Sequence, residues 1–281
     1  MIKVTWFGTT TLLFDDGKDQ ILFDAHVTRP SLVSYVRGAE ASTNVSLCNK
    51  LIELHRINRL RATFISHTHH DHVMDAPYIA NKCGARIYGS ESARKVALGG
   101  SVPTENIRVF QHGSEYTIGD YKITILKSLH SKPTPLNDDI GEPIEKALVQ
   151  PASLRAYKEG GSYDFYIEHK GKKILIRPSF NYIEGQLNGI SADVIFLGVA
   201  GLAKAEPDME KRFFRETVEK TGARLVIPIH WDNFFKSLEG PVEGMPDAIE
   251  NSEEVFFRLG VYCETHKVNL LIQYPRTSIE L

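Results

Sequence analysis

The sequence predicts a mixed α/β protein built from two similar halves. The first half opens with strand-like segments at Thr5 to Phe14 and Gln20 to Asp24, and the Asp16-Gly17 pair between them is a strong hairpin signal. The second half has the same arrangement, with Tyr163 to His169 and Lys173 to Ile176 on either side of a glycine turn. Helical patterns follow both strand sets. This order indicates an internally duplicated α/β architecture.

Five segments are expected to be helices because their apolar residues recur at helical spacing between start and stop signals. In chain order they are Val45 to Asn58, Met74 to Cys83, Ser90 to Leu98, Asp208 to Lys220 and Ser252 to Leu259. The fourth is the best delimited, since Pro207 precedes it and Gly222 follows it.

The Pro- and Gly-rich stretch from Ser131 to Gly161 is longer than an ordinary connection between elements. We therefore expect it to form a lid, with a turn or two of helix around Ser153 to Lys158. With this insertion, residues 1–281 are expected to form a single domain.

Composition narrows the class of protein. A chain of 281 residues with 42% apolar and 24% charged residues is ordinary for a globular protein. A net charge of −2 disfavours a nucleic-acid partner. The N-terminus lacks a secretory signal, and the most apolar run, Val194 to Ala203, is too short to span a membrane. We expect a cytoplasmic protein with a small-molecule substrate, with homo-oligomerisation left open. The three cysteines form no CxxC pair and are expected to be inert.

The run His67-Thr68-His69-His70-Asp71-His72 is the strongest indication of function. Neutral imidazole is the commonest side-chain ligand for zinc and similar ions, and a carboxylate among imidazoles can bind the metal or accept a proton. A histidine-rich surface loop is the alternative interpretation. The apolar strand Ala62 to Ser66 before the run and the helical segment after it favour a metal site.

Four polar residues of metal-site type share one position, at the end of a predicted strand. They are Asp24, His67, His130 and His230. A lone His130 or His230 would more often be an interior histidine than a ligand. Their common placement favours a preorganised site at the mouth of a sheet.

The pattern His67-x-His69-x-Asp71-His72, followed by His130 and His230 and preceded by Asp24, resembles the metallo-β-lactamase superfamily of metal-dependent hydrolases. The similarity covers nearly the whole chain. It is strongest to the branch that includes ascorbate-lactonase-like and phospholipase-D-like members, whose first strand resembles Trp6-Phe7-Gly8-Thr9-Thr10-Thr11. The resemblance implies a four-layer αββα sandwich with metals at one edge between the sheets.

The resemblance also assigns roles to residues. His67, His69 and His130 would hold a first metal, and Asp71, His72 and His230 a second, whereas His70 is no ligand in the pattern. Asp24 would orient a ligating histidine. Such metals lower the pKa of a bound water from ~15.7 towards neutrality, and Asp71 would orient that water or take its proton. Zinc is the expected divalent metal, with iron or manganese as alternatives.

One position departs from the family pattern. Members normally have a metal-bridging aspartate after the strand that corresponds to Lys173 to Ile176, and Ser179 stands at that position here. A neutral hydroxyl compensates the repulsion between two dications less than a carboxylate does. We therefore expect one tightly bound metal and a weakened second site.

The sequence as a whole indicates a metal-dependent hydrolase that directs an activated water at an ester, lactone, amide or phosphoester. Two alternatives remain, a mononuclear iron oxidoreductase and a catalytically degenerate metal- or ligand-binding protein. Arg29, Arg177 and Asn181 are guesses for residues that bind an anionic substrate group. Val27 to Leu47 is expected to overhang the site, and Trp231 to Phe235 to add an aromatic wall.

Overall fold

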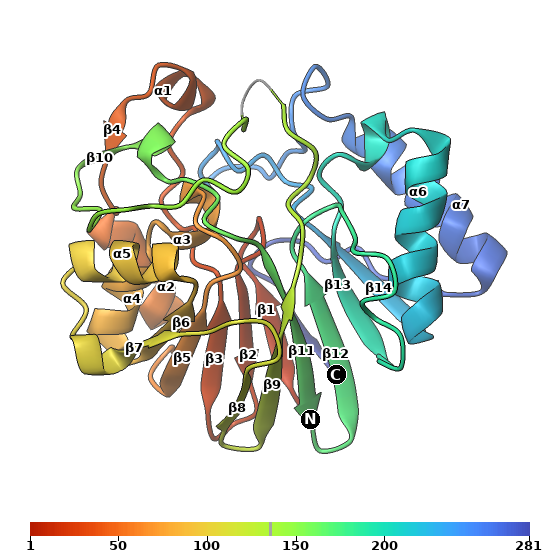
Figure 1. Cartoon of the computed structure of the whole chain (residues 1–281), viewed down its shortest axis with the longest axis horizontal. Coiled ribbons are helices and arrows are strands. Elements are labelled where there is room, and N and C mark those ends of the chain that lie inside the picture. Colours follow the sequence, from red (N-terminus) through yellow and green to blue (C-terminus); the bar gives the residue numbers. More distant parts are fainter. Residues whose placement is uncertain (135–136) are drawn as a thin grey trace.

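The structure, a computed structural model, describes residues 1–134 and 137–281. Two large β-sheets lie against each other in the middle of the molecule, and helices cover the outer face of each (Figure 1). The mixed α/β class and the helix–sheet–sheet–helix layering are therefore confirmed. Residues 135–136 of the expected lid lie outside the described residues.

Each large sheet has seven strands. The first has the order β16-β1-β2-β3-β5-β6-β7 and the second the order β15-β14-β13-β12-β11-β9-β8. The strands of the first sheet are β1 (Lys3–Trp6), β2 (Leu12–Asp15), β3 (Gln20–Phe23), β5 (Leu60–Phe64), β6 (Arg86–Gly89), β7 (Ile107–Val109) and β16 (Ser278–Glu280). Those of the second are β8 (Glu115–Ile118), β9 (Tyr121–Lys127), β11 (Tyr163–His169), β12 (Lys172–Arg177), β13 (Val194–Gly198), β14 (Leu225–Ile229) and β15 (Asn269–Leu270).

The two sheets repeat one pairing pattern. Followed from β16, the first sheet has three antiparallel pairings and then three parallel ones. Followed from β8, the second sheet has the same sequence of pairings. The C-terminal strand β16 returns to the first sheet beside β1, so both chain ends belong to that sheet. This pattern is the structural form of the duplication that the sequence indicates.

Helices cover the two outer faces unequally (Figure 1). On the first sheet lie α2 (Val45–Leu54), α3 (His70–Val73), α4 (Ala76–Cys83) and α5 (Glu91–Gly99), and on the second lie α6 (Pro207–Phe214) and α7 (Ser252–His266). A π-helical turn, η4 (Arg215–Glu219), continues α6, and short 3-10 turns are η1 (Thr104–Asn106), η2 (Leu154–Ala156) and η3 (Leu202–Lys204). Among the described residues, no helix combines the length and apolar character needed to cross a bilayer.

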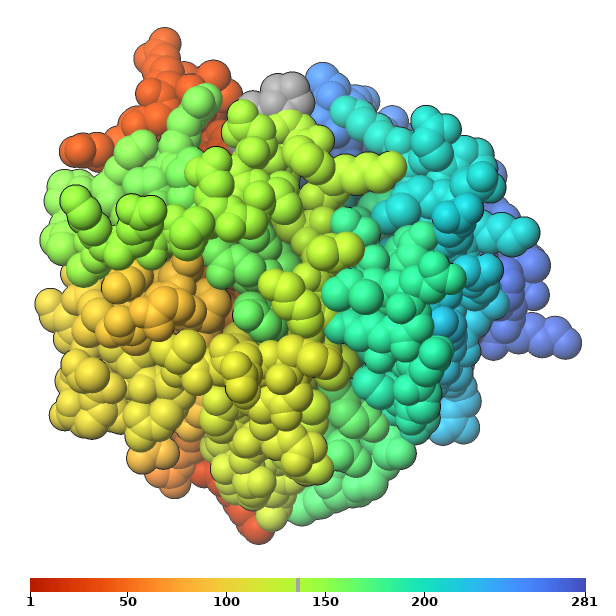
Figure 2. Space-filling view, viewed as in Figure 1, coloured from red at the N-terminus to blue at the C-terminus, as the bar shows by residue number. Residues whose placement is uncertain are grey.

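The expected lid lies against the first half of the molecule. Its short strand β10 (Ala152–Ser153) pairs with β4 (Glu40–Ala41), which follows the small helix α1 (Leu32–Val36). Figure 2 shows the green atoms of this part of the chain spread above the helices α4 and α5. Between residues 137 and 161, the segment is therefore packed on the fold.

Several expected element boundaries are wrong. Helix α2, for example, ends at Leu54 rather than at Asn58. Thr5 to Phe14 is not one strand but β1 and β2, separated by a turn in which Thr11 N donates to Gly8 O. Gly8 has a φ of 86°, and a Cβ at this position would collide with Arg29 and Asp232. The turn between β1 and β2 therefore requires glycine at this position. Helix α7 extends to His266 rather than ending at Leu259. The helix continues past Gly260 because the burial of Tyr262 and Cys263 stabilises the additional turns.

The core between the sheets is aromatic where the halves meet. The Phe23 ring lies 5.2 Å from Phe14, 5.5 Å from Phe64 and 5.1 Å from Phe165 between centroids. Phe14 in turn contacts Phe196 across the sandwich. These large buried rings fix the distance and orientation of the two sheets, and so the relative position of the loops at their ends.

Candidate metal centre

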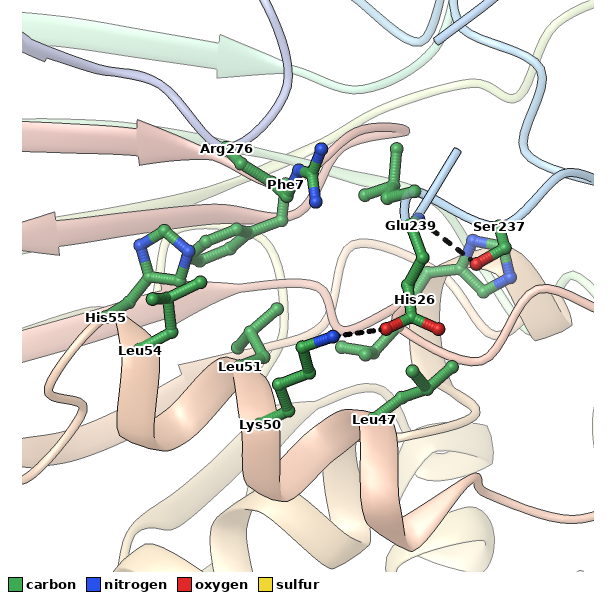
Figure 3. Close-up of a pocket in the computed structure, with 12 residues that line it drawn as sticks. Phe7, His26, Leu47, Lys50, Leu51, Leu54, His55, Ser237, Glu239 and Arg276 are labelled. Carbon is green, nitrogen blue, oxygen red and sulfur yellow. Dashed lines mark hydrogen bonds and ion pairs between the residues drawn. The ribbon is translucent and has the colours of Figure 1, made fainter. Parts of the chain in front are cut away.

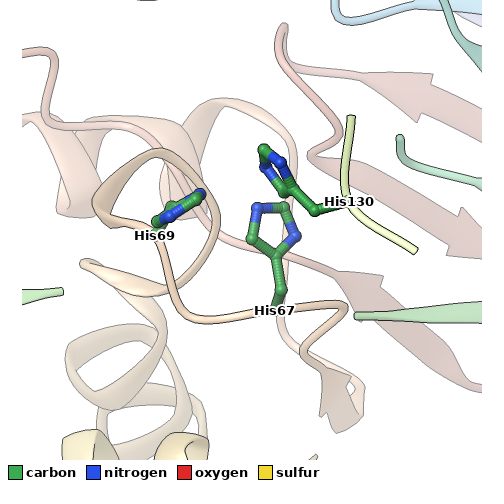
Figure 4. A group of neighbouring side chains, drawn as sticks. All are labelled: His67, His69 and His130. Carbon is green, nitrogen blue, oxygen red and sulfur yellow. The ribbon is translucent and has the colours of Figure 1, made fainter. Parts of the chain in front are cut away.

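Three histidines from both halves meet at one end of the sandwich (Figure 4). His67 and His69 lie in the loop after β5, and His130 follows β9 of the second sheet. Their ring centroids lie 4.7 to 4.9 Å apart, and one nitrogen of each lies within 4.8 Å of the others. These residues form the first group that could hold a metal ion.

A second group lies beside the first. Asp71 and His72 belong to the short helix α3, and His230 directly follows β14. Asp71 Oδ2 lies 3.5 Å from His72 Nε2 and 3.5 Å from His230 Nε2. Tetrahedral zinc ligands about 2.1 Å from the ion lie roughly 3.4 Å from one another. The two distances from Asp71 therefore match the spacing within a coordination shell.

The hydrogen bonds of the histidines fit a bound metal. In metal sites, one ring nitrogen ligates while the other is anchored by a protein acceptor. Four of these histidines are hydrogen-bonded through one ring nitrogen, which leaves the other nitrogen available for a metal. The contacts are His72 Nδ1 to Asp24 (2.8 Å), His69 Nε2 to Asp139 (3.0 Å), His130 Nδ1 to Ser131 O (3.1 Å) and His67 Nδ1 to Ser66 Oγ (3.2 Å). His67 Nε2 is buried with no hydrogen-bond partner among the described residues. A buried lone pair of this kind is what a metal ion satisfies.

Electrostatics favours the protonation states that ligands need. Burial, reinforced by the neighbouring histidines, holds the pKa of His67 well below its usual range and lowers the pKa of His130 to about 3. Burial alone would raise the pKa of Asp71, but His72 and His230 outweigh it and keep that pKa well below its usual range. Neutral imidazoles and an ionised carboxylate bind a metal without first losing a proton.

Asp24 is held by several donors at the end of β3. It accepts hydrogen bonds from Ser66 N (2.7 Å), Ser66 Oγ (2.7 Å) and Thr10 Oγ1 (2.5 Å) in addition to the contact with His72. Thr10 belongs to the turn between β1 and β2, and the neighbouring Thr9 O accepts from His230 N (2.8 Å). This turn thus supports both histidines of the second group.

The sequence did not single out Thr10, Ser66 or Asp139 as site residues. For Thr10, the run of three threonines before a strand was a usable signal, because hydroxyl groups in a tight turn often bond to nearby polar groups. Asp139 had no local signal, since its contact with His69 joins distant parts of the chain.

Ser179 is buried in the loop after β12. This loop contacts the His130 segment, because Asn181 Nδ2 donates to His130 O (2.7 Å) and Phe180 N donates to Ser131 Oγ (3.1 Å). Among the described residues, no carboxylate is shared by the two groups. The weakened second site remains a prediction.

The residues suggested for anion binding are already engaged within the fold. Arg29 forms a buried ion pair with Asp232 (2.8 Å), and Arg177 forms one with Asp164 (2.6 Å). The side-chain amide of Asn181 donates a hydrogen bond to His130 O. All three hold loops in place, and this geometry gives no support to a role in substrate binding.

Aromatic rings form a wall beside the second group. Phe234 lies 5.2 Å from the His230 ring, and Tyr35 of α1 stacks on His70 at 5.0 Å. His70 also stacks on Phe235 (6.2 Å) and belongs to neither group. Of the expected wall, Phe234 and Phe235 lie here, whereas Trp231 packs on Trp6 in the core.

A third group of possible ligands lies where the strand turns of both sheets meet. It comprises Asp16, Asp120 and His169. Its Asp120 is already paired with Lys170 (2.8 Å) and Lys18 (3.5 Å), and Asp16 with His169 (3.0 Å). We therefore describe it as an ion-pair cluster.

Comparison with known proteins agrees with the geometry. Residues 20–231 match the sequence model of the beta-lactamase superfamily domain. A search of curated proteins finds no significant match.

Solved structures share the fold at low sequence identity. The metallo-beta-lactamase fold protein YhfI from Bacillus subtilis has a TM-score of 0.58 and 16% identity, with 100% of both chains covered. An isothiocyanate hydrolase from Delia radicum gut bacteria has a TM-score of 0.62 and 14% identity, with 99% of both chains covered. Zinc-bound PqqB from Methylobacterium extorquens has a TM-score of 0.56 and 11% identity, over 96% of this chain and 87% of that one. Such similarity establishes the architecture.

Proposed function

The chain belongs to the beta-lactamase superfamily, and from this premise we propose that it is a metal-dependent hydrolase that acts on a small molecule. The observation that carries the proposal is the pair of three-residue groups, His67 with His69 and His130, and Asp71 with His72 and His230. Both groups combine ligand types and spacing that suit a divalent metal. Zinc is the metal we propose, and a fold neighbour binds it.

The metal supplies, when bound, a polarising charge and a water acidic enough to act as a nucleophile near neutral pH. The chain supplies the geometry. Asp24 and Asp139 fix which nitrogen of His72 and His69 points into the centre. Asp71 presents an ionised oxygen that orients a water molecule or takes its proton.

Phe234, Tyr35 and His70 bound the centre on one side with aromatic surface. Such a wall excludes bulk water from that side and favours an apolar substituent next to the scissile bond. An ester, lactone, amide or phosphoester is the bond class we propose. The isothiocyanate hydrolase among the fold neighbours adds the isothiocyanate group to the classes worth assaying.

The test is turnover by the zinc-loaded protein on a panel of esters, lactones, amides, phosphodiesters and isothiocyanates. The His67→Ala variant should lose activity by roughly a hundredfold or more, because a buried ligand of the first group is gone. His169→Ala, a buried histidine of the ion-pair cluster, is the matched control and should retain activity.

Two outcomes would favour the alternatives. Full metal occupancy without turnover on any class would indicate a metal- or ligand-binding protein. Purification with one iron and an ultraviolet-visible signature would favour an oxidoreductase.

A further inference from the structure

Two arginine–aspartate pairs are buried at the end of the sandwich that holds the metal groups. Arg177 Nη2 lies 2.6 Å from Asp164 Oδ2, and Arg29 Nη1 lies 2.8 Å from Asp232 Oδ2. All four side chains are at most 1% exposed. Because two charges lose their hydration on burial, such a pair is weak evidence for stability. The other contacts of each pair therefore indicate its role better than the ion pair does.

The first pair leads to His130, a ligand of the first metal group. Arg177 Nη1 donates to Asn181 O (3.0 Å), and Asn181 Nδ2 donates to His130 O (2.7 Å). Asp164 belongs to β11, whose register places it opposite Leu126 near the end of β9. The guanidinium of Arg177 thus ties β11 and the loop after β12 to the backbone of His130.

The second pair leads to His230, a ligand of the second metal group. Asp232 Oδ1 accepts from Thr9 N (2.7 Å), and Thr9 O accepts from His230 N (2.8 Å). Thr9 has a φ of 49° and His230 a φ of 62°, in the left-handed region that a β-branched residue rarely adopts. Such a backbone persists only where the surrounding contacts hold it. Asp232, fixed by Arg29, is one of these contacts.

The Arg29 side of this second network is fixed to the first half of the chain. Arg29 Nη2 donates to Phe7 O (3.2 Å). Figure 3 shows the Phe7 ring pointing towards His55 at the end of α2, and the two ring centroids lie 4.6 Å apart. His26, also drawn in Figure 3, contacts Thr9 Oγ1 through its Nδ1 (3.2 Å). The second pair therefore joins the loop after β14 to packed residues beside the first sheet.

We propose that Arg177 and Arg29 are positioning residues, each for one metal group. Arg177 sets the backbone of His130 in the first group, and Arg29, through Asp232, sets the backbone of His230 in the second. This role rests on the proposed function, since it concerns metal ligands. Each of these histidines is the ligand that its group takes from the second half of the chain. A shift of either one opens one coordination shell and leaves the other intact.

The test is competition for zinc with a chelator, analysed for two sites per chain, on two double variants. Arg177→Met with Asp164→Leu, and Arg29→Met with Asp232→Asn, remove both charges of a pair, so no unpaired charge is left inside. The asparagine keeps an acceptor for Thr9 N. The first variant should weaken the first site by about tenfold and leave the second unchanged, and the second variant should do the reverse. Each variant is the matched control of the other.

Imidazole NMR of the metal-free proteins gives a second readout that does not depend on zinc. The signal of His130 should shift in the Arg177 variant and that of His230 in the Arg29 variant, while the unfolding midpoint of both stays near that of the unmodified protein. A failure of the unmodified protein to bind zinc would contradict the proposed function, and the imidazole signals would still decide the positioning roles. Equal weakening of both sites by either variant, or signals of both histidines that do not move, would overturn the proposal.

Discussion

The Asp24→Asn substitution should weaken the second metal site while leaving the first nearly intact. Asp24 Oδ2 faces three groups that donate to it, Thr10 Oγ1 at 2.5 Å, Ser66 Oγ at 2.7 Å and His72 Nδ1 at 2.8 Å. An amide nitrogen placed there donates instead of accepting. The two hydroxyls can rotate and accept, because a hydroxyl is both donor and acceptor.

The imidazole cannot adapt in this way. To accept from the new amide, His72 must move its proton from Nδ1 to Nε2, and Nε2 is the nitrogen that faces Asp71. A protonated Nε2 cannot ligate. Restoring the ligating tautomer then costs about 1.5–3 kcal/mol, the value of a hydrogen bond to a charged acceptor, which corresponds to roughly a 10- to 100-fold loss of affinity.

The assay is competition for zinc with a chelator of known affinity, analysed for two sites per chain. His69 and His130 of the first site are anchored on Asp139 and Ser131 O, which do not contact Asp24, so the first site is the internal control. Unfolding of the metal-free variant shows whether the fold survives. Equal weakening of both sites, or no weakening of either, would refute the reasoning.

Three further predictions follow from other contacts. Ser179→Asp should raise the zinc content from about one towards two per chain, measured by elemental analysis at low free metal, and two zinc ions in the unmodified protein would contradict it. Asp139→Ala should weaken the first site by about tenfold in the same competition assay, and Asp139→Asn should weaken it less because its carbonyl still accepts from His69. Although burial opposes it, the amides of Asp19 and Lys18 and the His169 ring lower the Asp16 pKa from 3.8 to about 2. Asp16→Asn should therefore cost about 2 kcal/mol of unfolding free energy at pH 7, and its difference from the unmodified protein should vanish as the pH falls from about 4 to 2.

The strands that carry the centre were predictable because their patterns are local. β3, which leads into Asp24, and β12, which leads into the loop with Ser179, occupy the predicted segments, since continuous apolar and β-branched residues between turn signals are typical of buried strands. The break between β1 and β2 was missed because Gly8 is held by Arg29 and Asp232, and neither contact can be inferred from neighbouring residues.

The same limit applies to the centre. The spacing of His67, His69 and Asp71 identified candidate ligands, because metal ligands recur at short fixed intervals. The anchors of those ligands come from elsewhere in the chain, as Asp139 shows for His69. The ion pair of Arg177 was hidden from the sequence for the same reason, since its partner Asp164 lies on the neighbouring strand β11.

The division of ligands between the halves would make each bound metal a cross-link. Two ligands of each group follow β5 of the first sheet, and the third comes from the second sheet, after β9 or β14. Neither half can complete a shell, so tight binding requires both to be folded and docked. A ligand that binds only the folded state stabilises it by about 4 kcal/mol at a thousandfold excess over its dissociation constant. Removing the metal with a chelator should therefore weaken the packing between the two sheets at this end and lower the melting temperature. The size of this decrease measures metal affinity without any knowledge of the substrate.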